Sequence, residues 1–180
     1  LIDGKDIHSY SLADLRRNVG IVQQDVFLFS GNIKDNIALN NNELSDEEII
    51  QVAKYVNADR FISKLPQGYN EPVMERGATL STGQRQLIAF ARVLAYNPSI
   101  FILDEATSNI DTETELLIQD ALNKIIKDRT SIIIAHRLST IQNVDRILVL
   151  HKGEIVEEGS HFELLDKQGL YYDLYRLQYT

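Results

Sequence analysis

The chain has 180 residues, which is about the length of one domain. Its formal net charge is −8, which argues against a protein that coats nucleic acid through a general basic surface. It contains no cysteine, so disulfides, thiolate zinc sites and cysteine nucleophiles are excluded. The apolar runs are as long as strands and fall far short of the roughly 20 residues that cross a bilayer. Because the sequence begins at Leu1 rather than at methionine, we expect it to be an excerpt from a longer protein.

The first half of the sequence predicts short elements in chain order. Ser11 is the expected N-cap of a short helix, with Leu12 and Leu15 on its inner side. A strand follows within residues 18–23, and residues 40–43 are the most linker-like segment. The next helix is expected to begin after a capping box formed by Ser45 and Glu48, and a further helical pattern covers residues 87–94.

In the second half, continuous apolar strands alternate with helical patterns. The predicted elements are a strand at 100–103, a helix at 112–126, a strand at 131–135, a short helix around Thr140, a strand at 146–150, a hairpin around Gly153, and helices that follow a capping box of Ser160 and Glu163. Fully apolar strands between helices indicate a mostly parallel sheet covered on both faces. Ligands of such sheets bind at the carboxyl ends of the strands, so the polar residues at those ends are the candidates for a site.

Two adjacent carboxylates, Asp104 and Glu105, end the apolar strand at 100–103. Asp104 is suited to hold Mg²⁺, and Glu105 is suited to polarise an attacking water as a general base. The structural alternative is a strand that runs out into solvent through acidic residues. By themselves the two residues do not decide between these interpretations.

The run Leu-Ser-Thr-Gly-Gln at residues 80–84 directly precedes a helical pattern. A helix N-terminus with a serine and a glycine presents N–H groups and the positive end of the helix dipole, which suits a phosphate. Ser81 and Gln84 also fit an ordinary capping box, although such a box does not by itself require Gly83.

Two further polar residues follow apolar strands. His136 ends the run at 131–135, where its ring can donate a hydrogen bond to a phosphate oxygen. Gln24 ends the first strand, where its amide can ligate a metal or orient water. A lone histidine or glutamine is more often structural, so both gain meaning only together with the other motifs.

The order Gln24, residues 80–84, Asp104–Glu105 and His136 resembles the nucleotide-binding domain of an ATP-binding cassette (ABC) transporter of the exporter type. The resemblance covers essentially the whole chain. The matches to the family's motifs are Gln24 to the Q-loop glutamine, residues 80–84 to the signature motif, residues 100–104 to the Walker B strand, Glu105 to the catalytic glutamate, residues 108–111 to the D-loop, and His136 to the switch histidine. The run Glu-Arg-Gly at 75–77 is similar to the loop that touches the transmembrane domains of exporters.

The resemblance implies an α/β fold with a RecA-like P-loop NTPase core, a mostly parallel sheet and an inserted helical subdomain that carries the signature motif. It assigns residues 1–24 and 96–180 to the core and residues 25–95 to the helical subdomain. The family's phosphate-binding Walker A loop, Gly-x4-Gly-Lys-Ser/Thr, does not occur in these 180 residues. We therefore expect the N-terminal part of the core to be missing and the isolated chain to be inactive.

The resemblance also implies the cofactors, ATP and Mg²⁺, and a role for each matching residue. Asp104 and Gln24 would hold the metal, Glu105 would orient or deprotonate the attacking water, and His136 would contact the γ-phosphate. The signature residues would bind the ATP of a second nucleotide-binding domain, and Asp111 would communicate between the two sites. These signature residues are Ser81, Thr82, Gly83 and Gln84. The family most often has glycine where this chain has Thr82, which slightly favours a heterodimer over a homodimer.

The implied partners are a transmembrane domain and a second nucleotide-binding domain, with no nucleic acid, at the cytoplasmic face of the cell membrane. Residues 27–29, Phe-Leu-Phe, are expected either to face the transmembrane domain or to belong to the core. The alternatives are a soluble ABC-type ATPase of DNA repair or chromosome maintenance, a non-hydrolysing regulatory half, and an import-type ATPase. The transported substrate cannot be read from this sequence.

Overall fold

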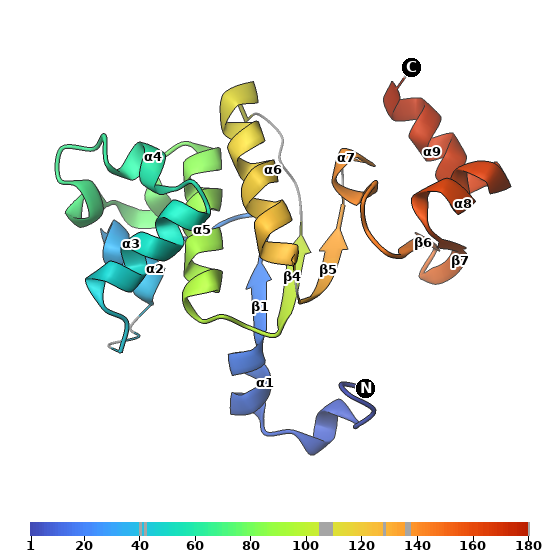
Figure 1. The fold of residues 1–180 in the computed structure, drawn as a ribbon, viewed down its shortest axis with the longest axis horizontal. Coiled ribbons are helices and arrows are strands. Elements are labelled where there is room, and N and C mark those ends of the chain that lie inside the picture. The colour runs from blue at the N-terminus through green and yellow to red at the C-terminus, as the bar shows by residue number, and fades with distance from the viewer. Residues whose placement is uncertain (40, 42, 105–109, 128, 136–137, 180) are drawn as a thin grey trace. The chain divides into compact units, whose positions relative to one another are not determined.

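The computed structural model describes residues 1–39, 41, 43–104, 110–127, 129–135 and 138–179. The chain divides into two compact units, Leu1–Ile134 and Ala135–Thr180, and each is described by itself (Figure 1). The division predicted from the sequence, with a core at 1–24 and 96–180 and a helical subdomain at 25–95, stays a prediction. Within the described ranges, no helix has both the length and the apolar character needed to span a membrane.

A parallel sheet lies at the centre of the first unit, where β1 (Val19–Val22), β4 (Ile100–Asp104) and β5 (Thr130–Ile134) pair in the order β1-β4-β5 (Figure 1). β-branched residues, which favour extended backbone, predominate in β1 and β5, and β4 combines two isoleucines with Phe101 and Leu103. The register pairs Val22 with Leu103. Because the strands are parallel, the residues that follow Val22 and those at the end of β4 leave the sheet at the same edge. The predicted strands and their parallel pairing are confirmed.

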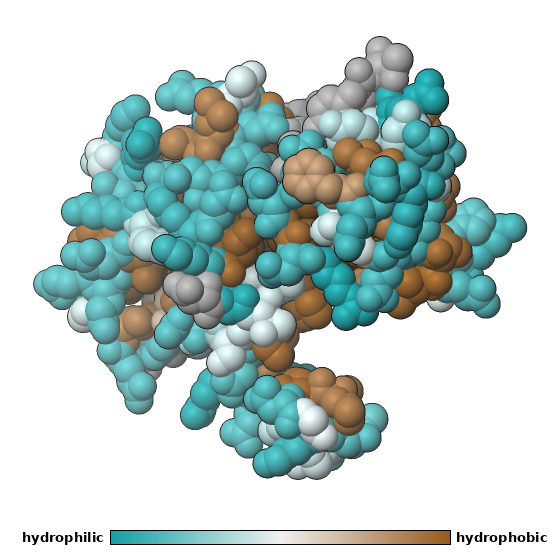
Figure 2. Space-filling view, turned by 45° about the vertical axis from the view of Figure 1, so that its right-hand side comes forward, coloured by the Kyte–Doolittle hydropathy of each residue, from teal (hydrophilic) through white to brown (hydrophobic). Residues whose placement is uncertain are grey.

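The two faces of this sheet differ in their cover. Phe101 and Leu103 are buried, whereas Ile21, Ile132 and Ile134 each expose about half of their surface, at 55%, 53% and 52%. The prediction of cover on both faces is wrong for the described residues. Successive side chains of a strand point to opposite faces, so a strand that is apolar throughout leaves one apolar row uncovered when its helices pack on the other face. Apolar surface is visible between hydrophilic side chains in the space-filling view (Figure 2).

The most buried helix described in the first unit is α5 (Thr82–Ala95), which packs against α6 (Thr112–Ile126). The ring of Phe90 in α5 meets that of Phe101 in β4 edge to face, with centroids 6.4 Å apart. β1 approaches α5 so closely that a Cβ added to Gly20 would lie 2.6 Å from Cγ1 of Val93. Glycine at this position of β1 therefore lets the sheet and the helix share one core.

Shorter elements complete the first unit. They are a 3₁₀ turn at Ile7–Ser9, β2 (Gly31–Asn32), α2 (Ile33–Ala38), α3 (Asp46–Tyr55), α4 (Asp59–Ile62), a 3₁₀ turn at Gly68–Asn70, β3 (Pro72–Val73) and a 3₁₀ turn at Glu75–Gly77. β2 and β3 pair antiparallel. Both α2 and α3 pack against α5, so α5 is the centre of a helical layer.

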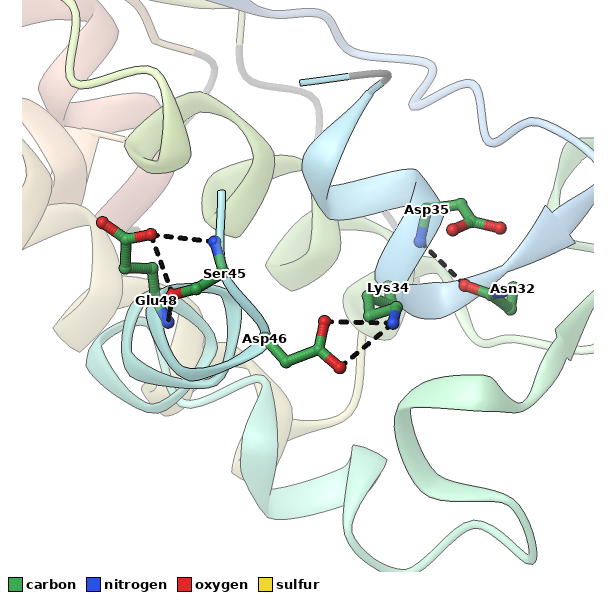
Figure 3. Close-up of polar contacts among 6 residues, drawn as sticks. All are labelled: Asn32, Lys34, Asp35, Ser45, Asp46 and Glu48. Atoms are coloured by element: carbon green, nitrogen blue, oxygen red, sulfur yellow. Dashed lines mark hydrogen bonds and ion pairs between the residues drawn. The ribbon is translucent and has the colours of Figure 1, made fainter. Parts of the chain in front are cut away.

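The first turns of α2 and α3 are joined by an ion pair, and each helix has a side-chain cap (Figure 3). Asn32 caps α2 through its side-chain oxygen. Ser45 and Glu48 form a reciprocal capping box at the start of α3, which confirms the prediction. Between them, Nζ of Lys34 lies 3.0 Å from a carboxylate oxygen of Asp46. The side chains that begin these two helices thus satisfy the N–H groups that no helical carbonyl reaches.

The first helix, α1 (Leu12–Asn18), begins at Ser11, whose hydroxyl accepts a hydrogen bond from the N–H of Asp14. The cap agrees with the sequence prediction. The expected inner side is not found, because Leu12 is 61% exposed and α1 has no buried residue in the described structure. Local capping thus defines this helix, and of the two residues expected on its inner side only Leu15 is even partly buried.

The second unit contains a hairpin and short helices. They are α7 (Leu138–Ile141), β6 (Ile147–His151), β7 (Glu154–Gly159), α8 (His161–Lys167) and α9 (Leu170–Tyr179). Positive φ angles of 52° at Lys152 and 86° at Gly153 form the tight turn between β6 and β7. The predicted hairpin and the capping box of Ser160 with Glu163 are confirmed. A small core of Ile147, Val149, Leu164 and Tyr171 holds the unit together.

Candidate functional site

A cavity of about 570 Å³ lies at the edge of the first unit where β1 and β4 end. It is lined by the polar residues that follow β1, by the last residue of β4, and by residues around the start of α5: Gln23, Gln24, Asp25, Val26, Phe27, Arg76, Thr82, Arg85, Gln86 and Asp104. Three of the predicted site residues, Gln24, Thr82 and Asp104, therefore line one cavity. The expectation that polar residues gather at the carboxyl ends of the strands is met for this part of the site.

Gln24 and Asp104 reach the cavity from neighbouring strands. Asp104 is the last residue of β4, and Gln24 follows β1 by two residues. Gln24 is exposed, and Asp104 is partly buried. The register that pairs β1 with β4 brings a carboxylate and an amide to one sheet edge, although 80 positions of sequence separate them.

The signature-like turn at 80–84 is the start of α5. The Ser81 hydroxyl accepts a hydrogen bond from the N–H of Gln84 at 3.2 Å, and the Gln84 side-chain oxygen accepts one from the N–H of Ser81 at 3.0 Å. The capping interpretation of these two residues is thus correct. It leaves the N–H groups of Thr82 and Gly83, in the first turn, without a helical acceptor, which keeps this helix end suited to an anion.

Thr82 is held by a residue that the sequence reasoning did not single out. Nη2 of Arg85 donates to the Thr82 hydroxyl at 3.1 Å, and Nη1 of the same guanidinium donates to the carbonyl of Leu80 at 2.6 Å. The only sequence signal for these hydrogen bonds is the i, i+3 spacing of Thr82 and Arg85 on a helix. The side chain found where the family most often has glycine therefore has a defined partner within its own chain.

Gly83 is buried because two helices meet at this residue. A Cβ added to it would overlap Cγ2 of Thr114 in the first turn of α6 and would lie 3.3 Å from Cγ2 of Ile110. The glycine that the capping box did not require is thus required by the packing of α5 on α6. This packing gives the glycine a structural role in addition to its predicted role, which is to let the backbone come close to a phosphate.

Asp111 is the N-cap of α6, and its carboxylate accepts a hydrogen bond from the N–H of Thr114 at 2.9 Å. This bond holds the pKa of Asp111 below its ordinary value, because it stabilises the ionised form. Because Thr114 also contacts the Gly83 position, the starts of α5 and α6 form one packed junction. A role of Asp111 in communication between two ATP sites stays a prediction.

Several predicted residues lie outside the described part of the structure. They are Glu105, residues 108–109 of the D-loop, and His136. β4 ends at Asp104, directly before Glu105, and β5 ends at Ile134.

The cavity contains charges of both signs. Asp25 and Asp104 contribute carboxylates, and Arg76 and Arg85 contribute guanidinium groups. Arg76 has a φ of 58°, in the left-handed region, next to Gly77 with a φ of 66°. The sequence reasoning assigned Arg76 to a loop facing a transmembrane domain, and the structure adds that this residue lines the cavity. Nearby guanidinium groups suit the negative charge of phosphates.

Two of the residues that line the cavity carry side-chain oxygens suited to Mg²⁺. Mg²⁺ prefers oxygen ligands and is usually held by one or two carboxylates together with waters and substrate phosphates. Asp104 offers carboxylate oxygens and Gln24 an amide oxygen at the same cavity. Among the residues with described positions, no cluster of three or more His, Asp or Glu side chains is present. Asp104 and Gln24 thus offer at this cavity two oxygen ligands of the kind that Mg²⁺ prefers.

The side chains of residues 27–29 lie partly at the surface and partly in the core. Phe27 and Phe29 are 46% and 53% exposed, with their rings edge to face and 5.0 Å between centroids. Leu28 is fully buried. The core interpretation therefore holds for Leu28, and the two rings form an exposed aromatic pair. That this pair faces a transmembrane domain stays a prediction.

Residues 1–108 match the family model described as ABC transporter. The chain belongs to the ABC transporter family. The resemblance to this family predicted from the sequence is thereby confirmed, while the roles of the individual motif residues stay predictions.

Two curated relatives illustrate the branch of the family. The chain is 56% identical over 178 residues to the "Probable multidrug resistance ABC transporter ATP-binding/permease protein YheH" of Bacillus subtilis, covering 99% of this chain and 26% of that protein. It is 52% identical over 179 residues to the "ATP-dependent lipid A-core flippase" of Syntrophus aciditrophicus, covering 99% of this chain and 30% of that protein. The chain therefore spans less than a third of the length of these relatives.

The structure of a bacterial Atm1-family ABC exporter with ATP bound superposes with a TM-score of 0.91 at 45% identity, covering 100% of this chain and 32% of that protein. This likeness confirms the predicted fold class, an α/β nucleotide-binding domain of the RecA-like type with a parallel sheet and a helical part. It also agrees with the exporter branch of the family indicated by the sequence relatives.

Proposed function

We propose that this chain is part of the ATP-hydrolysing motor of an ABC exporter. The observation that carries the proposal is the cavity at the carboxyl ends of β1 and β4, which gathers Gln24, Asp104 and the signature residue Thr82 in a chain of this family. The names of the relatives, which join ATP binding to a permease or a flippase, favour transport over the soluble DNA-repair type of ATPase.

In the proposed mechanism, the chain positions groups around the γ-phosphate of ATP. Asp104 and Gln24 would hold Mg²⁺, which would supply positive charge to offset the negative charge of the phosphate oxygens. Gln24, on an exposed segment beside Asp104, also orients a water molecule. Phosphoryl transfer to water needs little covalent chemistry from the protein, so this positioning is the main contribution of these residues.

Two residues beyond the described ranges complete the proposed site. Glu105 directly follows the last residue of β4, and we assign to it the orientation or deprotonation of the attacking water. His136 follows β5 by two residues, and we assign to it a hydrogen bond to the γ-phosphate. Both roles rest on the match to the family's motifs.

The start of α5 is proposed to bind the ATP of a second nucleotide-binding domain. Ser81, Gly83 and Gln84 would face that nucleotide, with the first-turn N–H groups and the helix dipole as donors. Asp111, at the adjoining start of α6, would then lie between the two sites. Thr82 in place of glycine favours a partner that is a different chain, and the composition of the purified transporter decides this point.

The whole protein is proposed to sit at the cytoplasmic face of the cell membrane with transmembrane domains in the same or an associated polypeptide. Groups outside this sequence would supply the phosphate loop, because Gly-x4-Gly-Lys-Ser/Thr is absent from the 180 residues. The relatives bear the names of a multidrug resistance transporter and a lipid A-core flippase, and we propose an apolar or amphipathic cargo for this protein.

The proposal is tested in the full-length protein with the variant Glu105→Gln. General-base catalysis is worth roughly a hundredfold or more, so ATP turnover is expected to fall by at least about a hundredfold while ATP binding persists. Glu113→Gln, on the exposed side of the first turn of α6, is the matched control and should keep turnover within about twofold. Turnover of Glu105→Gln near that of the wild type would overturn the assignment.

A further inference from the structure

Helix α5 carries two arginines, Arg85 and Arg92, that bind loops rather than carboxylates. They are seven positions apart, which places them on the same side of the helix and about 10 Å apart along its axis. Arg85 binds the turn at 80–82. Arg92 reaches the segment at 27–29 and the helix that follows it. One rigid element thus holds both the signature-like turn and the exposed aromatic pair.

Arg92 uses its whole guanidinium group in this contact. Nε donates to the carbonyl of Asn36 at 2.8 Å, Nη1 to the carbonyl of Phe27 at 3.0 Å, and Nη2 to the side-chain oxygen of Asn36 at 3.1 Å. Charged donors make the stronger hydrogen bonds of a protein interior. The three bonds therefore join α5 to the backbone of the 27–29 segment and to α2.

Asn36 is the second half of this contact, and it is only 1% exposed. Its side-chain oxygen accepts from the N–H of Phe29 at 2.8 Å, and its side-chain nitrogen donates to the carbonyls of Phe29 and Asn32 at 2.8 and 3.0 Å. Residues 26–29 have no helical or strand hydrogen bonds of their own, so these side chains supply the partners that the backbone requires. The position of the two exposed rings is thus fixed by Asn36 and Arg92.

Leu28, in the same 27–29 segment, links this segment to the region of the signature-like turn by side-chain packing. A Cβ added to Gly77 would lie 2.9 Å from Cδ1 of Leu28 and 3.0 Å from Cδ of Arg85. Both side chains therefore pack closely against this glycine. Arg85 in turn binds the Leu80 carbonyl and the Thr82 hydroxyl. A continuous set of packed and hydrogen-bonded groups therefore runs from the aromatic pair to the start of α5.

We propose that Arg92 and Asn36 are positioning residues for the signature motif: they fix the exposed pair Phe27–Phe29 to α5, so that a displacement of the pair moves the turn at 80–84. The kinetic part of this inference rests on the proposed ATPase function. The pair would be displaced by the membrane portion that docks on it. The packed chain through Leu28, Gly77 and Arg85 transmits the movement, because close-packed groups shift together.

The test is hydrogen–deuterium exchange on the full-length protein carrying Arg92→Met, which keeps the side-chain length and removes the donors. Backbone amides of residues 26–32 and of residues 78–84 are both expected to exchange at least about tenfold faster than in the wild type. Arg17→Met, at an exposed arginine of α1, is the matched control and should change neither segment. Faster exchange in residues 26–32 alone would overturn the proposal, because the turn at 80–84 would then be independent of Arg92.

A second measurement separates positioning from general destabilisation. If Arg92 positions the signature motif, Arg92→Met should lower kcat at least about fivefold with KM within about twofold, and Arg92→Lys should recover part of the loss because it still donates to one carbonyl. Arg85→Met should be non-additive with Arg92→Met in kcat, and strict additivity would count against the link.

Two outcomes keep the test decisive. If the Arg92→Met protein shows no cooperative thermal unfolding, the Arg92→Lys variant is used in its place. Hydrogen–deuterium exchange is then measured in the same two segments, residues 26–32 and 78–84. Absence of ATP turnover in the wild-type protein would overturn the proposed function, whereas the exchange pattern tests the link between the two segments and needs no turnover.

Discussion

The two units of this chain use their polar side chains differently. In the first unit a large core that includes Phe90, Phe101 and Leu103 surrounds α5, and polar residues at the sheet edge line an open cavity. In the second unit the core contains few buried side chains, and the described polar groups connect its elements. Polar groups such as Asn36 and Arg92 also join elements of the first unit, but its large apolar core leaves further polar groups at the sheet edge available for ligands, whereas the small core of the second unit depends more on polar contacts for cohesion.

The second unit shows this dependence at the start of α9. The two carboxylate oxygens of Glu157 in β7 accept from the N–H groups of Leu170 and Tyr171 at 2.7 and 3.0 Å. A Cβ on Gly169 would overlap this carboxylate, so the glycine gives it access to the helix. Nearby, Nδ1 of buried His161 lies 2.7 Å from the hydroxyl of Tyr171. Hydrogen bonds between side chains and helix starts thus connect β7, α8 and α9.

The largest expected effect is in the first unit, at Gly83. Gly83→Ala places a methyl group against Thr114 and should destabilise the junction of α5 and α6 by about 1–3 kcal/mol, with loss of ATP turnover. Thermal unfolding and ATP hydrolysis of the full-length protein measure both effects.

The double variant Gly83→Ala with Thr114→Ser separates packing from phosphate binding, because serine lacks the methyl group that the new Cβ would meet. Stability should return. Turnover should stay low if the backbone at Gly83 must approach a phosphate closely, and recovery of both would show that the glycine serves packing alone. Thr114→Ser by itself is the control.

A smaller effect is expected in the second unit, from Glu157→Gln. One carboxylate oxygen is replaced by an amide nitrogen that cannot accept a hydrogen bond, so one N–H at the start of α9 loses its partner at a cost of about 1–2 kcal/mol. Amide exchange at residues 170–171 should rise about tenfold, while kcat stays within about twofold.

Glu154→Gln, at an exposed position of the same strand, should leave this exchange unchanged. An equal rise in both variants, or a large fall in kcat for Glu157→Gln, would contradict the contrast between a unit that binds ligands and one held together by polar contacts.

The smallest effect concerns pH and the capping boxes, which occur in both units. Hydrogen bonds from the backbone and hydroxyl of Ser45 lower the pKa of Glu48, and the same groups of Ser160 lower the pKa of Glu163. A carboxylate with a lowered pKa stabilises the folded state above its unfolded value, near 4.3, and this contribution is lost as the pH falls through the lower folded pKa.

Amide protection at Ser45 and Ser160, corrected for intrinsic exchange, should therefore decrease from neutral pH to below about pH 4. The box of Ser81 with Gln84 has no titratable group and provides an internal control that should not change. Equal pH dependence at all three serines would refute the assignment to the two glutamates.

The sequence predicted the local structure well because the signals are local. The helix expected at 112–126 is observed over the same residues, and the capping boxes at Ser45, Ser81 and Ser160 all form. A capping box needs only two residues three positions apart: a serine whose hydroxyl accepts from the later N–H, and a Glu or Gln whose side chain accepts from the serine N–H. The same argument was wrong for the inner side of α1, because which face of a helix is covered depends on distant residues.

The sequence by itself determined the family, through the order and spacing of Gln24, the turn at 80–84 and the strand that ends at Asp104. Each of these motifs alone has a structural alternative, so it is their combination in a fixed order that points to the family. The sequence also predicted a mostly parallel sheet from continuous apolar runs between helices, whereas the order β1-β4-β5 and the antiparallel pairing of β6 with β7 came from the structure.

Only the tertiary structure decided that Gly83 is fixed by Thr114, that Thr82 is bound by Arg85, and that Asn36 and Arg92 hold the backbone of residues 27–29. Some of these contacts join segments that are distant in sequence, and others depend on the direction in which a long side chain extends. The local periodicity of the sequence predicts neither kind of contact. The physical reason is that packing and hydrogen bonding are satisfied in space, where residues from separate segments become neighbours.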